Sequence, residues 1–175
     1  MNIYLLLWIV TMFLCLSGCA PFWFLTQKHY ALSWPVSLAQ EPSDSPIFET
    51  KFGQRRYEIW LRSKRTIPLQ DLDCYMGMNH LPNQCAQYPN QINIRWQIFG
   101  DGKLVTSGVE TEFSGGSWTN KYIERIFGSF DAIEGVKYQM KIEVLRDGTL
   151  LNPAEPSFQI YACYNPANKS LTCRP

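Results

Sequence analysis

Apolar and polar side chains alternate along several short segments of this chain. In residues 91–99 the apolar positions are Ile92, Ile94, Trp96 and Ile98, with polar residues between them. A period of two residues is typical of a half-buried strand. Residues 100–103 (Gly-Asp-Gly-Lys) favour a tight turn, so residues 104–108 are expected to complete a hairpin. Residues 138–148 repeat the alternation and also end in Asp-Gly.

Four more segments have the composition of strands, namely residues 47–52, 56–63, 122–130 and 157–163. Most of these segments are separated by Gly, Pro, Asn or Asp, and no stretch shows a clear amphipathic helical period. About seven short strands of this kind predict an all-β, antiparallel β-sandwich or small barrel instead of a βαβ fold.

Residues 133–138 (Ile-Glu-Gly-Val-Lys-Tyr) resemble the approach to a late strand in fibronectin type III-like domains. The resemblance implies that the hydroxyl of Tyr138 binds nearby backbone, as in the tyrosine corner of Greek-key sandwiches. The alternative is that Tyr138 is an ordinary inward-facing strand residue. The fold expected is therefore an antiparallel immunoglobulin/fibronectin III-like β-sandwich. The Cys-Trp-Cys arrangement of antibody domains is not evident, because Cys74 and Cys85 lie in a polar, turn-rich loop.

The N-terminal segment carries no charged side chain from Ile3 to Thr26. It ends its first apolar stretch with Leu16-Ser17-Gly18-Cys19, which resembles the lipobox of bacterial lipoproteins. The resemblance implies cleavage before Cys19 and lipid (diacylglycerol, palmitate) on its sulfur. In that family, Asp after the cysteine retains the lipoprotein at the inner membrane. Because Ala20 follows Cys19 here, the resemblance also implies a lipoprotein of the outer membrane that faces the periplasm. An uncleaved signal anchor stays open, since the start lacks Lys and Arg and a run of about 20 apolar residues spans a bilayer. A buried structural segment is the third alternative.

These features divide the chain into three parts. We expect a signal peptide, or part of an anchor helix, at residues 1–18, and a lipidated cysteine with a tether at residues 19–46. Frequent Pro and Ser without a sustained period are typical of a linker. The β-sandwich domain is then expected at residues 47–175.

Four cysteines remain outside the apolar segment: Cys74, Cys85, Cys163 and Cys173. An even number in an exported chain predicts two disulfides. Pairing Cys74 with Cys85 and Cys163 with Cys173 closes short loops, whose entropic cost is low. Crossed pairing and four free thiols remain alternatives.

Charge and motifs argue against several functions. The net charge is +1 and the charges are interspersed, so no basic surface for nucleic acid is indicated. The chain has two histidines and lacks G-x-S-x-G, H-E-x-x-H, P-loop and dinucleotide-binding motifs. We therefore predict a protein that is not an enzyme and needs no cofactor.

Two loops carry candidate binding residues. Met76, Met78 and His80 form a soft ligand set suited to Cu(I), although methionines near a disulfide commonly pack into the domain. Trp118 lies beside Gly115 and Gly116, a composition found in loops that bind a sugar or a protein. The alternative is that Trp118 caps an open end of the sandwich.

Taken together, these patterns predict a lipid-anchored protein of the cell envelope that binds a protein partner. The partner would belong to an envelope assembly or be a toxin that the protein neutralises. Glycan binding, copper handling and a single-span, inner-membrane anchored domain are the alternatives.

Overall fold

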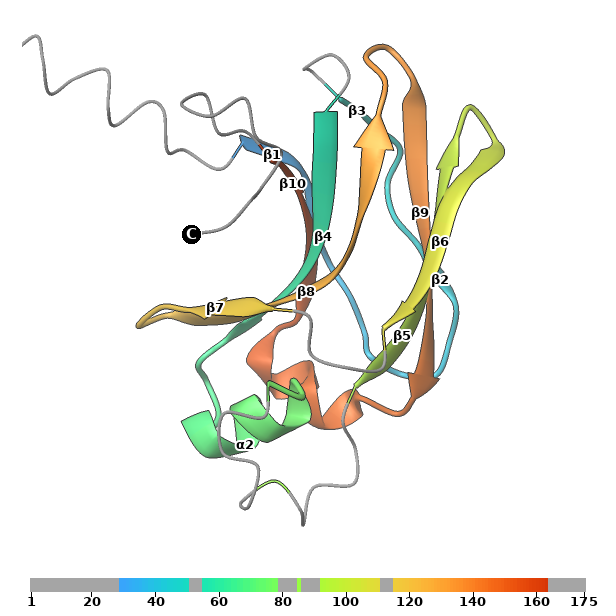
Figure 1. Ribbon diagram of the computed structural model, residues 1–175. Helices are drawn as coiled ribbons and strands as arrows, with labels where there is room; N and C mark the ends of the chain where they lie inside the picture. The colour runs from blue at the N-terminus through green and yellow to red at the C-terminus, as the bar shows by residue number, and fades with distance from the viewer. Residues whose placement is uncertain (1–28, 51–54, 79–84, 86–91, 111–114, 164–175) are drawn as a thin grey trace, which may run out of the picture.

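The computed structural model describes residues 29–50, 55–78, 85, 92–110 and 115–163. Two antiparallel sheets pack face to face (Figure 1), which confirms the predicted all-β sandwich. The apolar N-terminal segment and Cys19 lie outside the described residues. Among those described, no helix is long and apolar enough to cross a bilayer.

Each sheet has a main path of hydrogen-bonded strands. Sheet A has the order β1 (His29–Pro35), β10 (Ser157–Ala162), β4 (Arg55–Lys64), β8 (Tyr122–Ala132) and β7 (Gly116–Trp118). Sheet B has the order β2 (Ser43–Asp44), β9 (Lys137–Arg146), β5 (Asn93–Gly100) and β6 (Lys103–Glu110), and β3 (Phe48–Glu49) also pairs with β9. Each segment predicted from the alternation contains a strand, although residues 47–52 contribute only β3.

Two short helices close one end of the sandwich (Figure 1): the α-helix α2 (Leu69–Tyr75) and the 3-10 helix η1 (Thr149–Ala154). The helix α2 follows Pro68, and η1 is followed by Glu155, which has a left-handed backbone. With 7 and 6 residues, neither helix is long enough to show an amphipathic period in the sequence. Both bury apolar side chains against the core.

Trp96 lies at the centre of the core, where glycines of both sheets make room for its ring. Its side chain is 5% exposed, and its Nε1–H donates to the carbonyl of Phe127 at 2.7 Å. A Cβ on Gly108 of β6 would lie 2.6 Å from Cζ2 of Trp96, and one on Gly128 of β8 would lie 2.2 Å from it. These glycines therefore let the indole reach from sheet B to sheet A.

Tyr138 forms the tyrosine corner that the sequence resemblance implied. It lies near the start of β9 and is 2% exposed. Its hydroxyl accepts a hydrogen bond of 2.8 Å from the backbone N–H of Ile133. Its ring packs against Phe48 and Phe130, with centroids 5.8 and 5.5 Å away. The hydroxyl thus fixes the β8–β9 turn to the core.

The strand order differs from that of immunoglobulin domains in one respect. There, the last strand belongs to the sheet that carries the core tryptophan. Here Trp96 is on β5 in sheet B, whereas the last strand of the described residues, β10, lies between β1 and β4 in sheet A. The likeness to that fold is therefore one of architecture and of the tyrosine corner.

The predicted tether is wrong for residues 29–46, which belong to the sandwich. The strand β1 pairs with β10, and β2 pairs with β9. Between them Leu38 is fully buried, its N–H donates to Asn152 Oδ1 at 3.1 Å, and its carbonyl accepts from Gly148 N–H at 2.9 Å. The domain therefore starts no later than residue 29. The strand is hard to see in the sequence because β1 is an edge strand with a register shift, and it ends at Pro35.

Candidate functional site

The predicted copper ligands Met76 and Met78 lie in the core. Their side chains are 0% and 2% exposed. The hydroxyl of Ser63 donates to Sδ of Met76 at 3.6 Å, and the end of the Met78 side chain packs against Gly116. His80 lies outside the described residues. Both thioethers are engaged in packing, as the alternative interpretation predicted, and the geometry gives the copper hypothesis no support.

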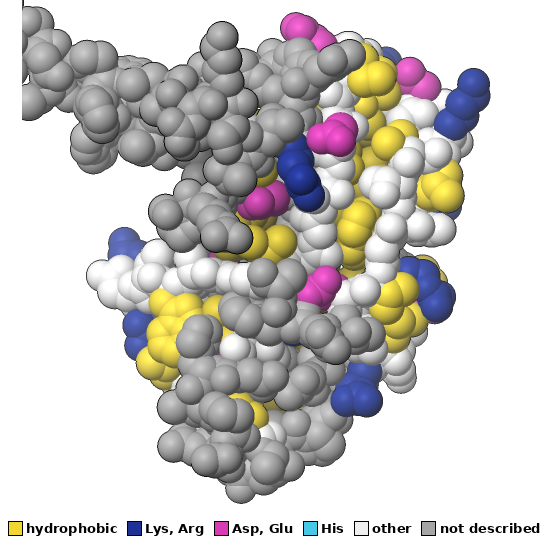
Figure 2. Space-filling model, viewed as in Figure 1, with side chains coloured by type: hydrophobic (Ala, Val, Ile, Leu, Met, Phe, Trp, Pro, Cys, Tyr) yellow, Lys and Arg dark blue, Asp and Glu magenta, His cyan; other side chains and the backbone are white. Residues whose placement is uncertain are grey.

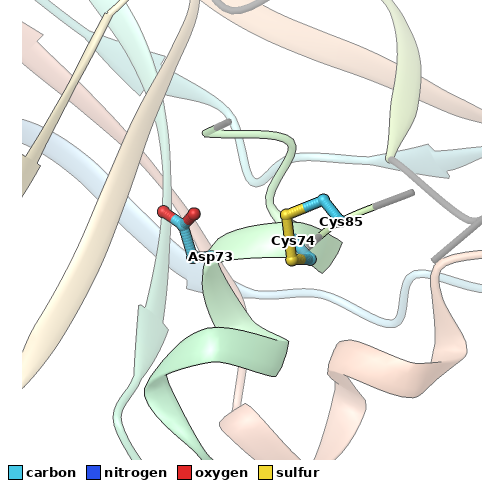
Figure 3. A group of neighbouring side chains, drawn as sticks. All are labelled: Asp73, Cys74 and Cys85. Atoms are coloured by element: carbon cyan, nitrogen blue, oxygen red, sulfur yellow. A yellow bond between two sulfur atoms is a disulfide. The ribbon is translucent and has the colours of Figure 1, made fainter. Parts of the chain in front are cut away.

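Asp73, Cys74 and Cys85 form a buried group whose ligand atoms lie within 4.8 Å of one another (Figure 3). The two sulfurs are joined in a disulfide, which confirms the predicted Cys74–Cys85 pair. Because metals bind the thiolate form of cysteine, an oxidised pair is not a metal site. Cys163 is also disulfide-bonded, to a partner outside the described residues, so its pairing with Cys173 stays a prediction.

Gly115, Gly116 and Trp118 lie at the free edge of sheet A, where β7 pairs with β8. A Cβ on Gly116 would lie 2.4 Å from the carbonyl oxygen of Glu124, and the carbonyl of Gly115 accepts from Ile126 N–H at 2.9 Å. The two glycines therefore let the backbone of this segment lie close to the backbone of β8. Trp118, in contrast, is 42% exposed, and because it pairs with Ile123 it lies on the opposite face of the sheet from Ser117.

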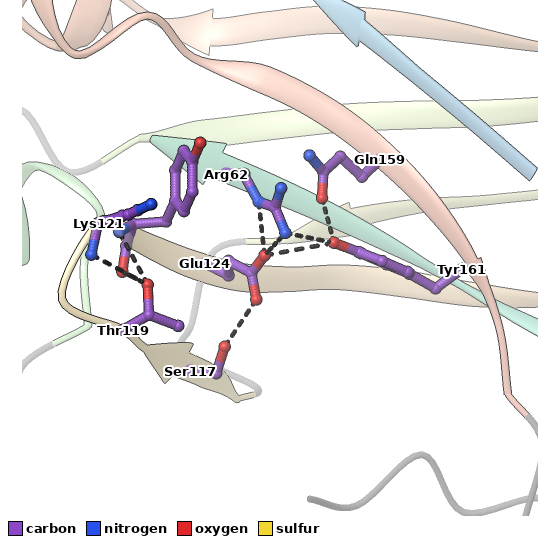
Figure 4. Close-up of polar contacts among 8 residues, drawn as sticks. Arg62, Ser117, Thr119, Lys121, Glu124, Gln159 and Tyr161 are labelled. Carbon is purple, nitrogen blue, oxygen red and sulfur yellow. Dashed lines mark hydrogen bonds and ion pairs between the residues drawn. The ribbon is translucent and has the colours of Figure 1, made fainter. Parts of the chain in front are cut away.

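A polar network lies on the outer face of sheet A, where β7 meets β8 (Figure 4). Arg62 of β4 binds Glu124 of β8 through Nε and Nη2, at 2.6 and 2.5 Å from Oε1. The same Nη2 donates to the hydroxyl of Tyr161 at 2.9 Å, and Tyr161 also hydrogen-bonds Gln159. Ser117 of β7 donates to the other oxygen of Glu124 at 2.7 Å. Four strands thus contribute to one network.

Burial makes this network rigid. Glu124 is 3% exposed and Tyr161 is 2% exposed, whereas the Arg62 side chain keeps 22% exposure. A two-point arginine–carboxylate contact is directional, and in a buried setting its loss leaves an uncompensated charge. Both oxygens of Glu124 accept hydrogen bonds, so the function of this carboxylate is to fix Arg62.

The turn that joins β7 to β8, together with the side chains around it on both faces of sheet A, is here named the β7–β8 corner. Its members are Arg62, Arg65, Trp118, Lys121 and Tyr122. The guanidinium of Arg62 lies 4.7 Å from the centroid of the Tyr122 ring. In the turn, Thr119 Oγ1 accepts from the N–H groups of Lys121 and Tyr122 at 3.2 and 2.9 Å, and Arg65 donates to the Thr119 carbonyl at 3.2 Å. Hydrogen bonds therefore hold the turn in one shape.

The charge of the corner is positive. Its three cationic side chains against the single carboxylate of Glu124 leave a net charge of +2. Figure 2 shows hydrophobic side chains flanked by Lys and Arg on the left of the molecule, where β7 lies in Figure 1. Sequence reasoning found Trp118 through its glycine neighbours but missed Arg62 and Tyr122, because only strand pairing brings β4 beside β8.

The inward side of β8 carries a buried cation, Arg125. It is 1% exposed, and its Nη1 donates to the carbonyl of Met76 at 2.6 Å. Burial lowers the pKa of Arg125 from its usual value, and the carboxylate of Glu110, 3.8 Å from Nη2, acts in the opposite direction. This arginine connects sheet A to the segment after α2 and to β6.

Comparison with known proteins gives a likeness of fold. No protein-family model matches the chain, and no curated protein matches it. Among solved structures, the crystal structure of GEBA250068378 from Sulfurospirillum deleyianum is similar, with a TM-score of 0.56 and 14% sequence identity. The match covers 77% of this chain and 98% of that chain. At this level of identity, the chain is similar to that protein in its fold alone.

Proposed function

We propose that this chain is a lipid-anchored protein of the bacterial envelope whose sandwich binds a protein partner and does not catalyse a reaction. The observation that carries the proposal is the β7–β8 corner, where Arg62 lies over the ring of Tyr122 and Trp118 of the neighbouring strand is 42% exposed. Trp, Tyr and Arg are the residues that most often dominate the energy of protein interfaces.

The rigidity of the corner favours binding. Arg62 is fixed by Glu124 and Tyr161 before any partner arrives, which reduces the side-chain entropy lost on association. The positive charge predicts a partner with an acidic surface, because complementary charge accelerates encounter at low salt. Catalysis is a poorer fit, since the hydroxyl of Ser117 donates to a carboxylate that Arg62 already holds, and the corner contains neither His nor Cys.

The envelope location rests on the likeness of residues 16–19 to a lipobox. The Cys74–Cys85 disulfide supports it, because disulfides persist in oxidising compartments. The test is the intact mass of the protein extracted from membranes of its native host. We expect a chain that starts at Cys19 and carries lipid. A full-length, unmodified mass would refute the lipid anchor and favour an uncleaved anchor helix.

Partner binding is tested by photocrosslinking in cells. A photoreactive residue at Lys121 is expected to capture one protein species, whereas the same residue at Ile133, which is 58% exposed, serves as the control position. The captured protein is then purified and titrated. We expect Trp118→Ala to raise the Kd about tenfold or more, as for an interface hot spot, while Ile133→Ala leaves it unchanged. An unchanged Kd for Trp118→Ala would refute the assignment of the corner.

Glycan binding remains the second candidate, because the exposed indole of Trp118 can stack on a sugar ring. It predicts a different result. Tryptophan fluorescence would change on titration with cell-wall oligosaccharides in wild type and not in Trp118→Ala, and photocrosslinking at Lys121 would capture no protein.

A further inference from the structure

The outer face of sheet A is buried, although it is turned away from the core of the sandwich. Trp60 of β4 alternates with the core residues Ile59 and Leu61, so its side chain points outward, yet it is only 4% exposed. Gln159 of β10 also alternates with core residues and is 3% exposed. Its outward neighbour Tyr161 packs edge-to-face against Trp60, with ring centroids 5.9 Å apart. The strand β10 therefore buries side chains on both of its faces.

The outer face of sheet B shows how an uncovered face looks in this fold. On β5, Arg95 is exposed and Gln97 is half-buried, and on β9 Lys141 is exposed. Such alternation is typical of an antiparallel sheet with one face in solvent. Within the part of the chain that the structure describes, no helix or strand lies over the outer face of sheet A (Figure 1). This face therefore requires a cover that the described elements do not supply.

Cys163 indicates where the cover is attached. Its N–H donates to the carbonyl of Arg56 at 2.8 Å, which continues the ladder between β10 and β4 by one residue. Because side chains alternate along a strand, the sulfur of Cys163 is on the same outer face as Tyr161. Cys163 is 2% exposed, and its disulfide partner lies outside the described residues. The partner cysteine must therefore approach the outer face of sheet A.

Elimination favours Cys173 as this partner. Cys74 and Cys85 are joined to each other, which leaves three cysteines, namely Cys15, Cys19 and Cys173. Under the proposed function, Cys15 is removed with the signal peptide and the sulfur of Cys19 carries lipid. The choice of Cys173 rests on the proposed function in this one step.

The reach of the C-terminal segment, residues 164–175, matches the area to be covered. The strand β10 leads directly into Cys163, so this segment starts at the outer face. The loop between the two cysteines, residues 164–172, spans at most about 30 Å when extended, and because the disulfide requires it to return, it extends about 15 Å from Cys163. Gln159 is four residues back along β10, about 13 Å away. A loop of this length therefore reaches over the buried part of β10.

We infer that the C-terminal segment is bound over the outer face of sheet A and is held there by a disulfide between Cys163 and Cys173. In this position it covers Trp60 and Tyr161. It also keeps solvent from the hydrogen bonds that fix Arg62 in the β7–β8 corner, and such bonds are stronger in a medium of low dielectric constant. The segment therefore contributes to the rigidity of the corner.

The test is photocrosslinking within the full chain, extracted from its membranes in detergent. Benzoylphenylalanine in place of Trp60 keeps an aromatic side chain on the outer face. We expect an intramolecular product, in which tandem mass spectrometry places the link on a residue of the C-terminal segment. The matched control is benzoylphenylalanine at Gln97, which points outward from sheet B. We expect at least about fivefold less of this product from the control, because packed sheets lie about 10 Å apart and Gln97 faces away from sheet A.

Other photocrosslinking results overturn the inference. A link from position 60 to residues 20–28 would show that the N-terminal segment covers the face. A product of higher mass would show that a partner or a second copy does. The absence of any link to the C-terminal segment would also overturn the inference.

Hydroxyl-radical footprinting gives a second readout, in a Cys163→Ser variant that ends at residue 163. Oxidation of Trp60 should be at least about fivefold faster in this variant than in the full chain, and should approach the rate of Trp118, which is 42% exposed. Trp96, in the core, should stay protected in both chains, which shows that the sandwich is folded. An unchanged rate at Trp60 in the folded variant would overturn the inference.

Disulfide mapping of the full chain separates this inference from the proposed function. A link between Cys163 and Cys173 in a chain without lipid would refute the lipid anchor and support the position of the C-terminal segment. A lipidated chain in which Cys163 is not linked to Cys173 would overturn the inference and leave the lipid anchor in place.

Discussion

The space around Trp96 makes Gly128→Ala the most informative single substitution in the core. The added Cβ would lie 2.2 Å from Cζ2 and 2.6 Å from Cε2 of the indole. Contacts this short cannot persist, so either the ring or the β8 backbone must move. Both sides of the ring are confined, because Gly108 is the neighbour on β6 and Gly128 the neighbour on β8.

The expected loss of stability has two sources. Forcing an extra methyl into a packed core costs about 1–3 kcal/mol. Moving the ring also weakens the 2.7 Å hydrogen bond from Nε1 of Trp96 to the Phe127 carbonyl, and leaving a buried polar group unpaired costs about 1–3 kcal/mol. The sum is about 2–6 kcal/mol, a large part of the about 5–15 kcal/mol that stabilises an ordinary domain.

Urea unfolding followed by far-UV circular dichroism measures this loss, with the disulfides kept intact. Gly102→Ala is the control that separates steric overlap from backbone strain. Nothing lies within 4 Å of a Cβ at Gly102, but its φ is +77°. Its expected cost is about 1–2 kcal/mol, from the left-handed backbone alone.

A double-mutant cycle identifies the cause. In a Trp96→Phe background the overlapping atoms are absent, so Gly128→Ala should cost less than about 1 kcal/mol there. The reasoning is refuted if Gly128→Ala changes the free energy of unfolding by less than about 0.5 kcal/mol, or if the two substitutions are additive.

Two further substitutions test local features. Tyr138→Phe should lower the free energy of unfolding by about 1–3 kcal/mol and speed hydrogen exchange at the Ile133 amide, which loses its acceptor, whereas Tyr122→Phe should change neither. Asp147 accepts from Thr149 N–H at 2.9 Å, and this bond lowers its pKa below the ordinary 3.8. A lowered pKa stabilises the fold above the unfolded pKa, and that stabilisation is lost as the pH falls through the folded value. Asp147→Asn should therefore be less stable than wild type at pH 6, and the two unfolding curves should converge at pH values well below 3.8; a constant difference would contradict the assignment.

The features predicted correctly from sequence are those with a local signal. A period of two residues identified β5 and β9 of sheet B because each buries one face. The spacing of Gly135 and Tyr138 indicated the tyrosine corner, and a separation of 11 residues favoured the Cys74–Cys85 pair. The strand β1 lacked such a signal. Its register shift interrupts the alternation, and its proline is compatible with an edge strand but is also typical of a linker.

The candidate site could be predicted only in part, because its residues come together through pairing at long range. Arg62 and Glu124 are 62 positions apart, and Glu124 and Tyr161 are 37 apart. Their contact depends on the register of β4 against β8, which includes a shift between Ile59 and Trp60. A one-residue slip would turn these side chains to the opposite face. Sequence periodicity shows which residues share a face of one strand, but it does not show which strand lies beside it.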